Sequence, residues 1–280
     1  MAWKTYRINC VSAATAALLA IVSGAAVRGW AGQGALAEQH YRRGVQFFLQ
    51  REPAKAAEQL ERSLELNPAQ PQALKLLGLS YQLTNETGKA RDAFERACKL
   101  KPRDADAWFF LGRLYYGENF FGKALKALNT AAGLNRRDQR VHTYLGLTLE
   151  AAGQIEEALR EYREAIKWNG QHRVPSFRPH YCYGALLSKL NRLKESERQL
   201  LRAIQLDPTI WEAHFELAKL RYKRGELKAA LEEVDRALQT GSKTAGQTAQ
   251  LYHLQARVYF RMGRAEEAER ALALREKVLR

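Results

Sequence analysis

The apolar positions of residues 72–102 fall into two sets, and each set has the spacing of an amphipathic helix, with intervals of three, four and seven residues. Gly78 in the first set and Ala90 in the second are small, which predicts a point where two helices cross closely. Pro102 lacks an amide hydrogen and ends the second helix. This stretch therefore predicts a helix, a turn and a second helix packed against the first. The larger apolar residues around the crossing are Leu74, Leu77, Tyr81, Phe94 and Ala97.

The same pattern returns along most of the chain, with a period of 34 residues and two steps of 38. The small residues of the first helices are Gly44, Gly78, Gly112, Gly146, Gly184, Ala218 and Ala256, and those of the second helices are Ala56, Ala90, Ala124, Ala158, Ser196, Ala230 and Ala268. Ala, Leu, Glu, Lys and Arg dominate the repeats, which also favours helix. We therefore predict an all-α fold without sheet, in which residues 38–280 form one array of about seven helix pairs. The repeats are expected at about 37–70, 71–104, 105–138, 139–172, 177–210, 211–244 and 249–280.

Repeat three shows a known signature in full, with Trp108, Leu111, Gly112, Tyr115 and Ala124 in order. This pattern resembles the tetratricopeptide repeat family, and the resemblance covers about residues 37–280. It implies an α-α superhelical solenoid in which each helix pair contacts only its neighbours.

Two spacers of four residues interrupt the period, one near residues 171–176 and one near 240–248. In solenoids such insertions usually form loops between repeats. We expect longer turns at both places. As an alternative, the first loop contacts a partner through His172, Arg173, Phe177 and Arg178.

Residues 1–37 do not follow the repeat pattern. Lys4 and Arg7 precede an uncharged run over residues 8–27, and small residues at 35 and 37 stand before Glu38. This layout predicts a secretory signal peptide cleaved near Ala37, and hence a periplasmic or secreted protein. The alternative is an N-terminal anchor in the inner or plasma membrane through residues 8–27, since about 20 apolar residues span a bilayer. A frayed cytosolic helix is the third reading.

The chain carries 45 Lys+Arg against 30 Asp+Glu, which gives a formal net charge of +15. This balance favours an acidic protein partner, anionic lipid or nucleic acid. Acids alternate with bases throughout the repeats, however, so an ordinary soluble surface explains the composition as well.

The sequence offers no catalytic residues, no cofactor motif and no metal-ligand cluster. Cys98 and Cys182 lie in non-adjacent repeats and are predicted to be free thiols. Four histidines occupy the same slot of four different repeats, too far apart to share one ion. We interpret them as core residues whose rings fill space between the helices, that is, as core filler. They are His40, His142, His180 and His214.

In the resembled family, the helix face beside the core stripe lines a concave groove that holds peptides. Carried onto this chain, that face presents aromatic rings beside bases, as binding hot spots often do. The alternative is that these rings contribute only to the packing between helices. The implied partner-binding residues are Phe109, Arg113, Tyr116, Tyr181, Phe215, Lys219, Tyr222, His253, Arg257 and Phe260.

The sequence thus predicts an exported, non-enzymatic scaffold that binds an extended or acidic segment of a protein partner in its groove. A membrane-tethered assembly factor of the cell envelope is the alternative, with membrane contact through the N-terminal segment only. Binding of single-stranded nucleic acid is less favoured. At the C-terminal end, Leu274 and Val278 lack a following repeat, so this end either frays or joins a homo-oligomer.

Overall fold

The computed structural model describes residues 33–171 and 173–280, so the predicted leader lies outside the described residues except for residues 33–37. The chain divides into two compact units at Leu114 and Tyr115. We call residues 33–114 the N-terminal unit and residues 115–280 the C-terminal unit.

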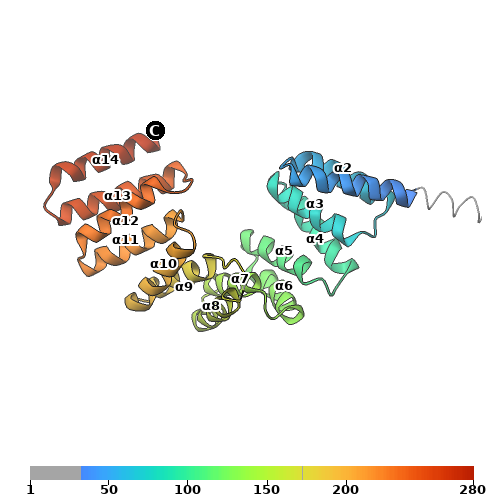
Figure 1. The fold of residues 1–280 in the computed structure, drawn as a ribbon, viewed down its shortest axis with the longest axis horizontal. Coiled ribbons are helices and arrows are strands. Elements are labelled where there is room, and N and C mark those ends of the chain that lie inside the picture. The colour runs from blue at the N-terminus through green and yellow to red at the C-terminus, as the bar shows by residue number, and fades with distance from the viewer. Residues whose placement is uncertain (1–32, 172) are drawn as a thin grey trace, which may run out of the picture. The chain divides into compact units, whose positions relative to one another are not determined.

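Within the described residues the chain forms fourteen helices and no strand, as the sequence predicts (Figure 1). The first helices of the seven pairs cover residues 33–49 and then α3 (Pro71–Leu83), α5 (Ala105–Gly117), α7 (Gln139–Ala151), α9 (Arg178–Lys189), α11 (Trp211–Arg224) and α13 (Ala245–Arg261). The second helices are α2 (Pro53–Leu66), α4 (Thr87–Leu100), α6 (Phe121–Leu134), α8 (Ile155–Asn169), α10 (Leu193–Leu206), α12 (Leu227–Gln239) and α14 (Ala265–Leu279). In the C-terminal unit α8, α10 and α12 each contact the first helix of their own pair and that of the next pair, and in the N-terminal unit α2 and α4 both contact α3.

Four glycines of the repeat pattern lie at helix crossings, as predicted: Gly44, Gly78, Gly146 and Gly184. A Cβ atom added at Gly78 would stand 2.7 Å from the Phe94 ring, and one at Gly146 would stand 2.5 Å from the Tyr162 ring. Gly44 has the same relation to Leu60, at 2.7 Å. Because real Cβ atoms do not approach other carbons so closely, only glycine permits these helix pairs to cross at this distance.

The turn inside each helix pair contains one residue with a positive φ, at the same place in all seven repeats. A left-handed conformation favours glycine, which has no Cβ, and asparagine, whose short side chain tolerates it. Asparagine or glycine at this place is therefore a second sequence signal of the repeat period. Repeat one is the exception, because it has an arginine there. The seven residues are Arg51, Asn85, Asn119, Gly153, Asn191, Gly225 and Gly263.

The two spacers take different forms. Residues 170–171 and 173–177 belong to a loop between α8 and α9, as predicted. Its far end is fixed by Asn169, which is 1% exposed and whose side chain donates to the Ser176 carbonyl at 2.7 Å and accepts from the Ser176 amide at 2.8 Å.

The second spacer adds mostly helix, so the prediction of a longer turn over residues 240–248 is wrong. α13 already begins at Ala245 and has 17 residues. The reason is a capping box, in which Thr244 and Gln247 satisfy each other's backbone amides and start the helix early.

At the other end of the chain, the first helix already covers residues 33–37, which the sequence pattern assigns to the leader. Ala37 is 1% exposed, and its carbonyl accepts a hydrogen bond from the Ser63 hydroxyl at 2.7 Å. Ala37 is therefore packed as part of the first helix pair.

Candidate functional site

A groove of about 400 Å³ lies in the C-terminal unit between α11, α13 and α14. It brings together four of the ten residues that the sequence predicts for partner binding: Phe215, Lys219, His253 and Arg257. Two further residues come from α14 and are absent from the sequence prediction, namely Arg275 and Leu279. No described residue that lines this groove is acidic.

The cations of the groove differ in how far they are neutralised. Lys219 lies 2.6 Å from the Glu216 carboxylate, and Arg275 lies 2.7 Å from that of Glu276. Arg257 is exposed and stacks 4.9 Å above the Tyr222 ring, and it forms no ion pair within the described part of the chain. Arg257 is therefore the group best placed to bind an anionic side chain.

The walls of this groove rest on a packed core. Phe215 and Tyr222 are half-buried against a cluster that includes Trp211, Val234 and Leu251. This packing fixes the backbone of α11 and α13, so the charged side chains project from rigid helices. Tyr222 accordingly supports Arg257 from below and does not line the groove itself.

Besides Tyr222, three of the predicted residues of the C-terminal unit lie outside the groove. Phe260 is 51% exposed. Tyr116 is half-buried, with its ring 5.9 Å from that of Tyr144 in an edge-on arrangement. Tyr181 packs against the cores on both sides of α9, and burial raises its pKa. The interpretation as packing residues therefore fits Tyr116 and Tyr181.

Phe109 is 3% exposed, so its predicted place on an open surface is wrong. Its ring packs on Phe110 at 5.4 Å, and Phe110 stacks on Phe94 at 5.7 Å. Trp108, the first residue of the repeat signature, is half-buried and donates from its indole nitrogen to the Pro102 carbonyl at 2.9 Å. The buried face of α5 thus extends to Phe109, while Leu111 and Tyr115 remain buried as predicted.

Arg113 belongs to the same N-terminal unit as Phe109. Its guanidinium donates to the Gln82 side chain at 2.6 Å and lies 5.4 Å from the centre of the Phe110 ring. Arg113 is thereby held against its own helix and α3, and its aromatic contacts are internal ones.

The four histidines of the shared slot are packed between the two helices of their pairs, and His214 is 4% exposed, as expected of a core residue. Each ring also forms a polar link between the two helices, which core filling alone does not require. Each ring contacts a glutamine or glutamate 19 residues further on. The pairs are His40–Gln59 at 2.8 Å, His142–Glu161 at 2.7 Å, His180–Gln199 at 2.8 Å and His214–Glu233 at 2.6 Å. The sequence carries this signal, since the three repeats without a histidine have alanine at the second position: Ala93, Ala127 and Ala271.

His142 has acceptors on both ring nitrogens, because its Nε2 lies 3.0 Å from the Arg136 carbonyl. Burial lowers the pKa of His142, but the hydrogen bonds to Glu161 and Arg136 and the Glu161 charge outweigh it, so this pKa is raised. Folding therefore gains stability from the protonated ring below about pH 6.5, the unfolded value, and loses it as pH rises through the raised pKa. At His180 burial lowers the pKa, so the sign there is opposite.

The remaining chemistry of the described residues is sparse. Cys98 and Cys182 are free and buried, and burial raises the pKa of each thiol to about 12, so neither is a thiolate at neutral pH. No group of three or more His, Cys, Asp or Glu in the described part of the chain is placed to hold a metal ion. Among residues 33–171 and 173–280, no helix combines the length and the hydrophobicity that a transmembrane span requires.

A family model described as tetratricopeptide repeat matches residues 41–105, 84–119, 111–172 and 184–245, and a second model with the same description matches residues 249–274. No curated protein shows a significant match. Among solved structures, PilF from Pseudomonas aeruginosa is 21% identical, covers 73% of this chain and 89% of its own, and has a TM-score of 0.64. PilW, described as a widely conserved type IV pilus biogenesis factor, is 18% identical over 73% of this chain and 91% of its own, with a TM-score of 0.65. A repeat protein from Parabacteroides merdae is 19% identical over 87% of this chain and 93% of its own, with a TM-score of 0.67. At these identities the structures share the fold.

Proposed function

Because this chain belongs to the tetratricopeptide repeat family, we propose that it is a protein-interaction scaffold that holds an extended, acidic segment of a partner between α11, α13 and α14. The observation that carries the proposal is the lining of this groove, which contains three cations and a histidine but no acidic residue, and in which Arg257 forms no ion pair with a described residue. Such a surface attracts acidic segments and rejects basic ones.

The groove also offers apolar contact, through Phe215, Leu254 and Leu279. Acidic side chains of the partner pair with Arg257 and Arg275, while an apolar neighbour is buried on the leucines. Since the packed helices hold these groups in place before binding, little conformational entropy of the scaffold is lost. Such binding requires no reacting group.

The test reverses two charges of the groove, with Lys219→Glu and Arg257→Glu in one protein. The probe is a fluorescein-labelled synthetic peptide of alternating glutamate and leucine, followed by fluorescence anisotropy. We expect binding at least tenfold weaker than for the natural sequence, because two attractive charges become repulsive. Equal affinity would refute the proposal.

A matched control carries Lys194→Glu and Lys228→Glu, which make the same change of net charge at exposed positions of α10 and α12. This protein should bind the peptide within about twofold of the natural sequence, allowing for long-range attraction screened by salt. Equal loss in the control would show that net charge, and no defined groove, causes the attraction. The helical circular dichroism of all three proteins should agree.

We further propose that the scaffold acts in the cell envelope, exported or tethered by its N-terminal segment. Two observations support this placement: the uncharged run over residues 8–27, and the likeness in fold to PilW, itself described as a pilus biogenesis factor. The burial of Ala37 and its bond to Ser63 favour the tethered form over cleavage after Ala37, since cleavage there would remove a packed residue. N-terminal sequencing of the native protein tests this, and a chain that starts at Glu38 excludes the tether.

A further inference from the structure

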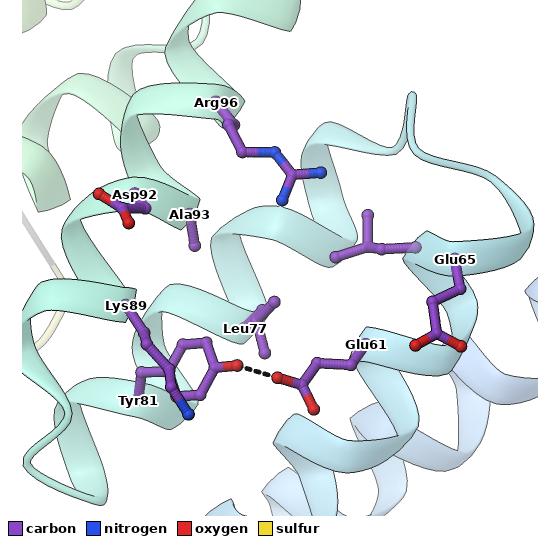
Figure 2. A pocket seen from close by; sticks show the side chains of 9 residues that line it. Glu61, Glu65, Leu77, Tyr81, Lys89, Asp92, Ala93 and Arg96 are labelled. Atoms are coloured by element: carbon purple, nitrogen blue, oxygen red, sulfur yellow. Dashed lines mark hydrogen bonds between the residues drawn. The ribbon is translucent and has the colours of Figure 1, made fainter.

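A second groove, of about 480 Å³, lies in the N-terminal unit, on the side of the second helices (Figure 2). α2 forms one wall and α4 the other, and side chains of α3 form the floor. The lining residues are Glu61, Leu64 and Glu65 on α2, Leu77 and Tyr81 on α3, and Lys89, Asp92, Ala93 and Arg96 on α4.

The groove exists because a long side chain is missing at Ala93. Four other repeats have glutamine or glutamate at the equivalent position, where it reaches a histidine of its own pair. Repeat two has Leu74 in place of that histidine and alanine in place of its partner. The short side chain leaves space above an apolar floor, in which Leu77 is 4% exposed and Ala93 is 3% exposed.

Tyr81 closes one end of the groove in a fixed position. Its hydroxyl donates to the Glu61 carboxylate across the groove, as Figure 2 shows, and Lys89 lies 5.1 Å above its ring. Burial and the neighbouring Glu61 carboxylate raise the pKa of Tyr81, so the hydroxyl keeps its proton. The floor is thus preformed and does not need a ligand to order it.

The charges along the rim are unequal. On the α2 wall both lining charges are carboxylates, Glu61 and Glu65. On the α4 wall, Lys89 is paired with Glu86 at 2.6 Å, while Asp92 and Arg96 are exposed. Within the described part of the chain neither Glu65 nor Asp92 has an ion-pair partner, and Figure 2 shows them on opposite walls. In a chain of net charge +15, this groove therefore presents surplus negative charge.

We propose that this groove is a second docking surface, and that its partner is an amphipathic segment with a lysine or arginine beside an apolar side chain. The apolar side chain fills the space above Leu77 and Ala93, and the cation pairs with Glu65 or Asp92 at the rim. Burial of the apolar group supplies affinity, and the charge selects against acidic segments. The groove between α11, α13 and α14 selects the opposite charge, so the two surfaces bind different segments.

The test uses the full chain with Glu65→Lys and Asp92→Lys, both at exposed positions. The probe is a fluorescein-labelled synthetic peptide with an arginine between two leucines, and its affinity is measured by fluorescence anisotropy. We expect the double variant to bind at least tenfold more weakly than the natural sequence. An equal affinity of the peptide for the double variant and the natural protein would overturn the proposal. So would the absence of saturable binding of the peptide to the natural protein.

Two comparisons separate the groove from general charge effects. Glu232→Lys with Glu269→Lys makes the same charge change at exposed positions of α12 and α14 and should leave the affinity within twofold. Ala93→Gln places a longer side chain in the groove without a charge and should weaken binding several-fold. If the peptide binds the groove variants (Glu65→Lys with Asp92→Lys, and Ala93→Gln) as tightly as it binds the charge control, binding occurs elsewhere and the docking surface is refuted.

Discussion

Gly146→Ala is the most direct test of the helix crossings. The added Cβ would stand 2.5 Å from the ring of Tyr162, which is fully buried. The ring has no free direction, because its hydroxyl also donates to Glu150 at 2.9 Å. Either the ring leaves its rotamer and this hydrogen bond, or α7 and α8 move apart.

The expected cost combines three effects. Overpacking costs about 1–3 kcal/mol, and a lost hydrogen bond adds about 1 kcal/mol. Alanine gains about 1 kcal/mol over glycine inside a helix. We therefore expect a net destabilisation of about 2 kcal/mol. For a chain of this size, that corresponds to a fall in melting temperature of roughly 4–8 °C.

The measurement is thermal and urea unfolding followed by circular dichroism, with amide hydrogen exchange to locate the effect. Because each helix pair contacts only its neighbours, exchange should accelerate first in α7 and α8. Gly133→Ala in α6 is the matched control, since an added Cβ there has no atom within 4 Å. It should stabilise the protein by up to about 1 kcal/mol through helix propensity alone.

Combining Gly146→Ala with Tyr162→Leu tests the cause. If the clash with the ring sets the cost, the double variant is less destabilised than the sum of the two single variants. A Gly146→Ala protein as stable as the Gly133→Ala control would refute the interpretation of the repeat glycines as contact points.

Three further changes test the helix pairs. His142→Gln should remove the stability gained on acidification below about pH 6.5, because the raised pKa of His142 makes protonation favour the folded state. The measurement is the difference between the urea midpoints at pH 5.5 and pH 8. If this difference is the same in the variant and the natural protein, the link to Glu161 is contradicted. Arg51→Gly should stabilise the first helix pair by about 1 kcal/mol, because Arg51 has a φ of 60°; a lower melting temperature would contradict it. Asn169→Ala should destabilise by about 1–3 kcal/mol and speed proteolysis of the loop ending at Ser176, since two buried hydrogen bonds are lost; protection equal to that of the natural chain would show that the loop is held otherwise.

The sequence predicts most of the fold because the repeat pattern is local. Helical spacing of apolar residues, and a small residue such as Gly78 or Gly146 at each crossing, act within one helix pair. Both glycines lie where that reasoning expects them. The left-handed turns are equally local, and a search for asparagine or glycine at the repeat period would have found six of the seven.

The candidate site is predicted only in part. Lys219 and Arg257 project from helix faces that the repeat pattern identifies, and they do meet in one groove. Arg275 and Leu279 join them from the second helix of the last pair, a contact that no single-helix pattern contains. The sequence also places Phe109 on the open face, although the neighbouring phenylalanines draw it into the core.

The sequence by itself determined how the helices pair and where most of the pairs cross, because those choices depend on residues within one repeat. Only the tertiary structure decided which side chains stay open to a partner, because exposure depends on what the next helix brings to the contact. Ala93 illustrates the difference. Its small side chain can be read from the sequence, but that side chain leaves a groove only because α2 and α4 lie on either side of Leu77.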